Sequence, residues 1–216
     1  MMSSLIGILS LLSTLSATSN ALTCTQCVST SASCSGSSVT CPSGSTCGSS
    51  YTETVVGAQT QVSFIRSCIA PAQCSFSGSL SIKQGYIRMG ISCCNSDDCT
   101  PTTPSLPARS STLNGQVCRT CVSADSTWCY TSDTVQCTGD ENMCLLQTTK
   151  ITGSQSVSTA LRGCSTKSIC DLGSQSQTVS DMSVEVKFIC TSGARSVHTF
   201  VLTPAIVCLL LLKLFY

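Results

Sequence analysis

Histidine is nearly absent from this sequence. The one histidine among 216 residues, His198, lies just before an apolar C-terminal run. The body of the chain therefore offers no histidine as a general base and none to activate a serine or cysteine nucleophile. We predict no catalytic residue, and hence a protein that is not an enzyme.

Charged and aromatic residues are also scarce, at 10% and 5% of the chain. Residues 22–192 contain nine Lys and Arg against ten Asp and Glu. This balance gives no basic patch, so we expect no nucleic acid as a partner. No window of the sequence keeps apolar residues at spacings of three and four, which predicts that helices are few.

Cysteine, in contrast, is abundant, with 19 in the chain. Ten lie in residues 22–100 and eight in residues 116–191. Up to Cys93 the steps between successive cysteines are 3, 7, 7, 6, 21, 6 and 19, and in the second set they are 3, 8, 8, 7, 20, 6 and 20. Seven steps that agree within one residue indicate an internal duplication.

Both sets of cysteines are even in number, and the nineteenth, Cys208, lies in the apolar tail. An even number in a chain with an export signal favours structural disulfides. The Cys24/Cys27 and Cys118/Cys121 pairs also have the spacing of redox or zinc motifs. We favour disulfides there, and we predict neither a metal site nor a cofactor.

The two ends of the chain predict export and attachment to a membrane. Residues 1–21 are typical of a signal peptide, with a short apolar run at 5–12. At the other end, residues 192–216 have small residues, a polar stretch and an apolar run, as in a signal for a glycosylphosphatidylinositol (GPI) lipid anchor. Ser192 and Gly193 are the candidate attachment residues. A short transmembrane helix is the alternative.

Between the ends, alternating and β-branched residues predict strands. Residues 52–56 and 61–65 should form a hairpin around a loop at 57–60, and residues 85–92, 143–151 and 183–189 should be strands. Residues 101–115 are rich in Pro, Ser and Thr and predict a semi-extended linker. The fold class is therefore all-β and disulfide-rich.

The cysteine pattern resembles the lymphocyte-antigen-6/urokinase-receptor domain, the three-finger fold shared with snake neurotoxins. The matching residues are Leu22-x-Cys24-x-x-Cys27, Cys93-Cys94 and Cys99. The resemblance implies two tandem three-finger domains, at 22–100 and 116–191. It also implies nine disulfides: Cys24–Cys47, Cys27–Cys34, Cys41–Cys68, Cys74–Cys93, Cys94–Cys99, Cys118–Cys144, Cys121–Cys129, Cys137–Cys164 and Cys170–Cys190.

The sequence departs from the usual family pattern in two places. Thr100 stands where the family usually has Asn after its last cysteine, and the second domain lacks the final cysteine pair. Ten cysteines followed by eight are similar to the gamma-type phospholipase A2 inhibitors, which are two-domain members of the family. Urokinase plasminogen activator surface receptor-like proteins are similar as well.

The resemblance implies a non-enzymatic extracellular binding protein. We expect a lipid-anchored protein on the outer leaflet of the plasma membrane that binds a protein ligand or receptor. The alternative is a secreted inhibitor of phospholipase A2; a toxin-like modulator of a channel or receptor rests on fold analogy alone. Candidate contact residues are Trp128, Tyr130 and Tyr51, although Trp128 and Tyr130 are equally interpreted as a cover over the disulfide of Cys129.

Overall fold

The computed structural model describes residues 21–153, 156–179 and 182–191. The expected signal peptide, apart from Ala21, and the expected anchor signal with Ser192 and Gly193 lie outside these residues. Within the described ranges, no helix is long and apolar enough to cross a membrane.

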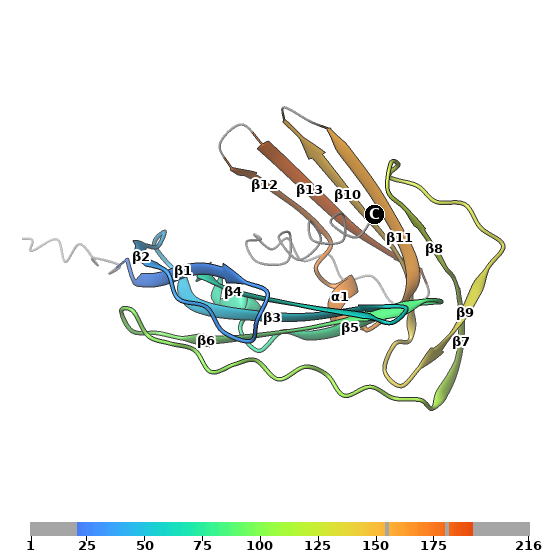
Figure 1. Ribbon diagram of the computed structural model, residues 1–216, viewed down its shortest axis with the longest axis horizontal. Helices are drawn as coiled ribbons and strands as arrows, with labels where there is room; N and C mark the ends of the chain where they lie inside the picture. The colour runs from blue at the N-terminus through green and yellow to red at the C-terminus, as the bar shows by residue number, and fades with distance from the viewer. Residues whose placement is uncertain (1–20, 154–155, 180–181, 192–216) are drawn as a thin grey trace, which may run out of the picture.

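The first half of the chain forms three antiparallel hairpins, which we call the first module (Figure 1). Its strands pair in the order β5-β6-β3-β4-β1-β2. A single 3-10 turn, η1, precedes β5. The elements are β1 (Thr23–Ser29), β2 (Ser37–Thr40), β3 (Thr46–Val56), β4 (Gln59–Ile69), η1 (Pro71–Gln73), β5 (Ser77–Ile82) and β6 (Gly85–Cys94).

The second half, the second module, repeats this plan with one change. Its first strand is split in two: β7 pairs with β9, and β8 pairs with β11. The elements are β7 (Leu113–Arg119), β8 (Cys121–Ser123), β9 (Thr134–Thr138), β10 (Met143–Thr152), β11 (Val157–Ser165), α1 (Lys167–Cys170), β12 (Ser174–Val179) and β13 (Met182–Thr191). The prediction of a nearly all-β, disulfide-rich chain with two tandem modules is confirmed.

The hairpin of β3 and β4 is longer and tighter than the sequence indicated. Val56 pairs with Gln59, so the connection has two residues rather than four. Gly57 has a φ of +60°, which a two-residue turn with glycine at its first position requires. Glycine adopts this angle without strain, so the strands can continue to the turn.

Nine disulfides hold the modules, and each lies within one module. In the first they are Cys24–Cys47, Cys27–Cys34, Cys41–Cys68, Cys74–Cys93 and Cys94–Cys99; in the second they are Cys118–Cys144, Cys121–Cys129, Cys137–Cys164 and Cys170–Cys190. Three cysteines of each module pack together. In the first module they are Cys24 and Cys41, which are buried, and Cys68, which is half-buried; in the second they are Cys118, Cys137 and Cys164, all buried. Because all six are bridged, these sulfur clusters fill space as apolar groups and hold no free thiolate.

The largest apolar core lies between the modules rather than inside either one. Leu80, Ile87 and Met89 of the first module pack in one cluster with eight buried side chains of the second. Those eight are Leu145, Ile151, Leu161, Ile169, Leu172, Val184, Val186 and Phe188. Burying such side chains contributes roughly 1.5–3 kcal/mol each. The two modules are therefore one folded unit.

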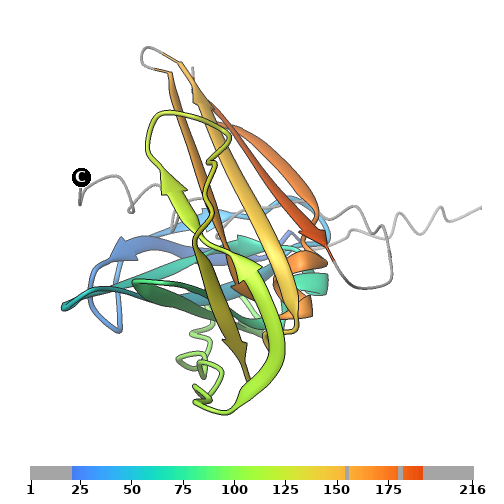
Figure 2. The same cartoon turned by 90° about the vertical axis from the view of Figure 1, so that its right-hand side faces the viewer.

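A short stretch of sheet pairing joins the modules beside this core. Ser81 pairs with Cys164 and Leu80 with Ser165, so β5 continues the sheet of β11 (Figure 2). Beyond the strand, the backbone N–H of Thr166 donates to the Ser79 carbonyl (2.9 Å), and the N–H of Ser79 donates to Thr166 Oγ1 (3.1 Å). The ten strands from β12 to β2 thus form a continuous path.

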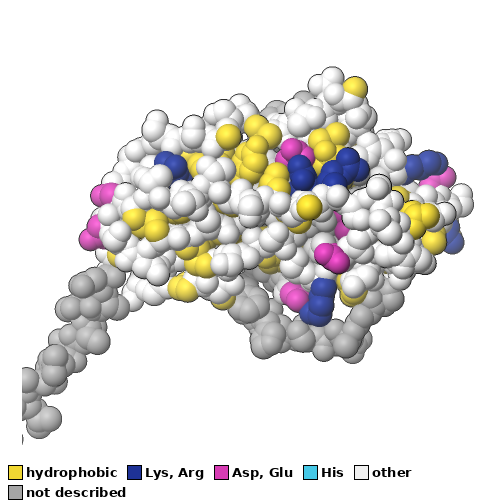
Figure 3. Space-filling view, turned by 90° about the horizontal axis from the view of Figure 1, so that it is seen from below, with side chains coloured by type: hydrophobic (Ala, Val, Ile, Leu, Met, Phe, Trp, Pro, Cys, Tyr) yellow, Lys and Arg dark blue, Asp and Glu magenta, His cyan; other side chains and the backbone are white. Residues whose placement is uncertain are grey.

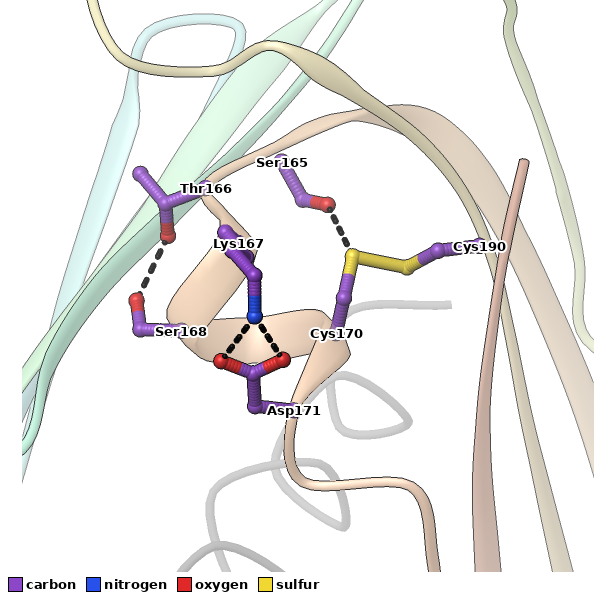
Figure 4. Close-up of polar contacts among 7 residues, drawn as sticks. All are labelled: Ser165, Thr166, Lys167, Ser168, Cys170, Asp171 and Cys190. Carbon is purple, nitrogen blue, oxygen red and sulfur yellow. Dashed lines mark hydrogen bonds and ion pairs between the residues drawn. A yellow bond between two sulfur atoms is a disulfide. The ribbon is translucent and has the colours of Figure 1, made fainter. Parts of the chain in front are cut away.

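The single helical turn α1 follows this junction and is held by polar contacts of its own (Figure 4). The Lys167 ammonium lies between the two carboxylate oxygens of Asp171, and the Cys170–Cys190 bridge ties the turn to β13. Ile169, on the same turn, is 1% exposed and enters the shared core. The turn therefore connects the junction to the core.

The segment between the modules, residues 100–112, lies along β6 (Figure 1). Arg88 of β6 donates to the Pro107 carbonyl (3.0 Å), and the Arg109 guanidinium stacks over the Tyr86 ring at 3.9 Å from its centroid. Pro101 and Pro104 are buried. Residues 113–115 of the expected linker are already part of β7. The segment is extended, as the proline content indicates, and it is packed against the first module.

A substitution at Gly163 of β11 tests whether the pairing of β5 with β11 holds the two modules together. A Cβ at this position would lie 2.1 Å from the Ser81 carbonyl oxygen, which is backbone and cannot move aside cheaply. We expect Gly163→Ala to lower the free energy of unfolding by about 1–3 kcal/mol, because the added methyl forces the modules apart. Chemical denaturation with the disulfides intact measures this.

The matched control is Ser158→Ala on the same strand, away from the junction, which should stay within about 0.5 kcal/mol of the native chain. Equal stabilities for the two variants would show that the modules are not held together at β5 and β11.

Candidate binding surface

The loop that joins β8 to β9, residues 124–133, carries the two aromatic residues singled out in the second module. The Cys121–Cys129 bridge ties its middle to β8. Its ends are held by local hydrogen bonds: the Ser123 hydroxyl donates to Asp125 Oδ1 (2.8 Å), and Arg119 donates to the Thr131 carbonyl (2.8 Å). A crosslinked loop of this kind loses little conformational entropy when it binds a ligand.

Trp128 and Tyr130 project from this loop into solvent. The Trp128 side chain is 54% exposed and Tyr130 is 93% exposed. Arg162 of β11 stacks on the indole, with its Cζ 4.2 Å from the ring centroid. We call Trp128, Tyr130 and Arg162 the aromatic patch. Trp, Tyr and Arg are the side chains that most often dominate binding energy at protein interfaces.

Cys129 is covered mainly from the inner side of the loop. It is 7% exposed and packs in one cluster with Leu146, Ala160 and Cys121. Tyr130, at 93% exposed, covers almost nothing. The interpretation of both aromatic side chains as covers for the disulfide therefore fits Tyr130 poorly.

Tyr51 lies elsewhere. It is half-buried in the middle of β3, where it pairs with Phe64 and Gly90. Its ring lies 6.2 Å from the Phe64 ring, centroid to centroid. The structure thus places Trp128 and Tyr130 on one loop of the second module and Tyr51 on a central strand of the first.

A cavity of about 160 Å³ lies between the modules. Side chains of β3, β5 and β6 form one wall, and those of β8, β10 and β11 form the other. The lining is Val55, Val56, Leu80, Ile82, Tyr86, Ile87, Val122, Ser123, Ala124, Gln147, Thr159, Ala160 and Leu161. Val122 is 48% exposed and Ala124 is exposed, so these two residues stand at the mouth.

A second, polar hollow of about 90 Å³ lies between the modules and is lined in part by the linker segment. Glu141, 7% exposed, accepts a hydrogen bond from the Ser79 hydroxyl (2.6 Å) across the module boundary. Burial raises the pKa of the Glu141 carboxyl above its ordinary value of 4.5, while the Ser79 and Ser81 hydroxyls and the Arg109 guanidinium oppose this rise. The carboxyl is a titratable group inside the module boundary.

Sequence reasoning missed Gln147 and Glu141. Both are polar residues in a chain rich in polar residues, and no sequence motif marks them as buried. Only the strand alternation of 143–151, which puts Gln147 on the same face as Leu145, carried a signal.

The chain is a tandem repeat of a disulfide-bonded, three-hairpin module, which places it in the class of proteins built from such modules. The model of the u-PAR/Ly-6 domain matches residues 20–102 and again residues 114–196. The chain belongs to this family. Its members are typically non-enzymatic binding proteins that are secreted or held at the cell surface.

Among solved structures, the chain is similar to the crystal structure of mouse TEX101. The two share 19% sequence identity over 78% of this chain and 97% of that chain, with a TM-score of 0.32.

The raised pKa of Glu141 predicts a pH dependence of stability. The folded protein binds the proton of this carboxyl more tightly than the unfolded chain does. The stabilisation of the folded state by this proton is therefore fully present below pH 4.5, and it is lost as the pH rises through the pKa of the folded protein. The free energy of unfolding of the native chain, minus that of Glu141→Gln, should therefore fall as the pH rises above 4.5, by at most about 1.4 kcal/mol per pH unit.

Denaturation curves of both proteins between pH 3 and pH 8 measure this difference. Asp140→Asn, which removes the exposed carboxylate next to Glu141, corrects for general effects of charge. A difference that rises with pH would contradict the assignment.

Proposed function

We propose that this chain is a lipid-anchored protein of the outer leaflet of the plasma membrane that binds a protein ligand or receptor through the aromatic patch. The observation that carries the proposal is the exposure of Trp128 and Tyr130 on a bridged loop, with Arg162 stacked on the indole. The small, polar and apolar stretches of residues 192–216 support the lipid anchor.

The energetics of the patch favour a protein ligand. Aromatic rings supply a large contact area with only two rotatable bonds each, so little entropy is lost when they are ordered. The Arg162 guanidinium already lies against the indole, so the pair is preorganised for contact. The Cys121–Cys129 bridge holds the loop in position before the ligand arrives.

The surface carries little charge that could attract a partner from a distance. In the view of Figure 3, charged side chains of both signs are interspersed, and several of opposite sign lie close together. The net charge of the whole chain is +1. We therefore expect binding that depends on short-range apolar contact and changes little with salt.

A secreted phospholipase A2 is the alternative ligand. Five bridges in the first module and four in the second are the arrangement that resembles the gamma-type inhibitors. On this alternative the chain acts as a secreted inhibitor, and the aromatic patch contacts the phospholipase.

Treatment of expressing cells with a phosphatidylinositol-specific phospholipase tests the anchor. We expect the enzyme to release most of the protein from the cell surface, because it cleaves the anchor's lipid from its glycan. A chain truncated after residue 199 lacks the apolar run and should appear in the medium without treatment. Full-length protein that stays on treated cells would rule out the lipid anchor and favour a transmembrane helix.

Alanine substitution of Trp128 and Tyr130 together tests the aromatic patch. The purified ectodomain is added to intact cells and, separately, to a panel of secreted phospholipases A2. We expect the double variant to lose about 2 kcal/mol or more of binding free energy, roughly thirtyfold in affinity, for whichever probe the native ectodomain binds.

The control carries Val28→Ala and Leu113→Ala, which remove two other exposed apolar side chains, both 59% exposed. This variant should bind as the native ectodomain does. Equal losses in the two double variants would exclude the aromatic patch as the contact surface. Unchanged phospholipid hydrolysis at micromolar ectodomain would remove the phospholipase alternative.

A further inference from the structure

The linker segment between the modules is held against one face of β6 by its backbone. Arg88, Gly90 and Ser92 share this face, because side chains two positions apart along a strand point the same way. The Ser92 hydroxyl donates to the Thr102 carbonyl, and Arg88 donates to the Pro107 carbonyl (3.0 Å). The carbonyl groups at both ends of this stretch are therefore directed at the strand.

Gly90 permits a close approach between these two contacts. A Cβ on Gly90 would lie 2.5 Å from the Ser105 carbonyl oxygen and 3.2 Å from the Pro104 Cβ, so a residue without a side chain is needed for the segment to lie on the strand. Pro101 and Pro104 are both buried. Proline rings and bonded carbonyls thus form the inner side of the segment.

The hydroxyls of the same stretch are on its outer side. Thr102, Thr103 and Ser105 are exposed, and no described residue makes a hydrogen bond with any of their side chains. Thr103 directly precedes Pro104, and proline favours an extended conformation in the residue before it. The segment therefore presents three unengaged hydroxyls on an extended backbone, and the contacts of its inner side keep them facing outwards.

The hydroxyls at the other end of the segment are more enclosed. Ser110 Oγ accepts a hydrogen bond from the Thr112 N–H (3.1 Å), and a Cβ on Gly139 would lie 2.7 Å from the Ser110 Cβ. The Thr112 carbonyl accepts from the Gly139 N–H (2.9 Å). The segment has no proline beyond Pro107. Outward hydroxyls flanked by proline are therefore confined to residues 102–105.

We propose that the linker segment is a site of O-linked glycosylation, with an N-acetylgalactosamine on one or more of Thr102, Thr103 and Ser105. Segments rich in Ser, Thr and Pro are typical carriers of such sugars in exported proteins. The co-substrate is a nucleoside-diphosphate N-acetylgalactosamine, used by a transferase of the secretory pathway. The side-chain oxygen forms a bond to the anomeric carbon of the sugar, and the bond from that carbon to the diphosphate breaks. The nucleoside diphosphate leaves with the electron pair and takes up the hydroxyl proton.

This site rests on the export of the chain, which is part of the proposed function, and it is independent of the lipid anchor and of the aromatic patch. Protein recovered from the cell surface or from the medium has been exported in either case. A missing sugar on that protein therefore counts against this site alone. The sequence contains no Asn-x-Ser/Thr motif, so N-linked sugars do not complicate the measurement.

Peptide mass spectrometry of the full-length protein from animal cells tests the proposal. Trypsin cleaves after Arg88, Arg109 and Arg119, so residues 89–109 and 110–119 are recovered as separate peptides once the disulfides are reduced. A sugar at 102–105 therefore cannot be mistaken for one at 110–112. We expect an N-acetylhexosamine on the first peptide, and electron-transfer fragmentation should place it on residue 102, 103 or 105.

Two triple variants locate the acceptors. The first removes the outward hydroxyls and should lose the sugar of residues 102–105 completely: Thr102→Val, Thr103→Val and Ser105→Ala. The matched control removes three hydroxyls beyond Arg109 and should keep that sugar: Ser110→Ala, Ser111→Ala and Thr112→Val. Native protein without sugar at residues 102–105, or with a hexose there in place of an N-acetylhexosamine, would overturn the proposal. Equal loss of that sugar in the two variants would do the same.

Transfer in vitro tests whether the folded chain presents the segment. Protein from cells that cannot make the activated sugar is incubated with UDP-N-acetylgalactosamine and purified polypeptide N-acetylgalactosaminyltransferases, either with its disulfides intact or after reduction and alkylation. We expect the folded protein to accept the sugar at residue 102, 103 or 105. Transfer to these residues in the reduced chain alone would mean that β6 withholds them from the enzyme, and the proposed site would be wrong.

Discussion

The shared apolar core is the constraint on which the remainder of this structure depends. Each module has fewer than 80 residues between its first and last cysteine, a size at which an apolar core alone provides little net stability. Each module also has a small interior cluster of bridged cysteines. Leu80, Ile87 and Met89 of β5 and β6 are buried in one cluster with side chains of the second module. Separation of the modules would expose this surface to water, so the two must keep one orientation.

Much of the fold could be predicted from the sequence because its signal is local or periodic. The cysteine ladders indicated the duplication, and β-branched alternation indicated β6, β10 and β13 within a few residues. The relation between the modules carried no such signal. It depends on Gly163 meeting the Ser81 carbonyl and on Thr166 meeting Ser79, residues more than 80 positions apart. The Pro-rich composition of residues 100–112 predicts an extended segment. It does not reveal that contacts with Arg88 and Tyr86 pack this segment against β6.

The candidate sites were predictable to different degrees for the same reason. Trp128 and Tyr130 were found because aromatic residues beside a cysteine are conspicuous in a chain with few aromatics. Tyr51 belongs to the same residue type, but strand pairing places its ring beside Phe64. Gln147 and Glu141 became visible only when burial was known, since a polar residue in a strand is ordinarily expected to face water.

The cavity itself follows from the way the modules are joined. On one edge of β11, Cys164 and Ser165 pair with the first module, whereas residues 160–162 pair with β8. The same edge of β11 therefore pairs with β5 along one part and with β8 along another. Where these two parts meet, the Lys83 N–H donates a hydrogen bond to Thr120 Oγ1 (3.0 Å). Thr120 is available because the first strand of the second module is split there into β7 and β8. Beyond this point, the end of the hairpin formed by β5 and β6 must diverge from β11. The space between them is the cavity, which is lined by apolar residues of both modules. A single undivided sheet would have no such space, so the split strand and the cavity are consequences of the same junction.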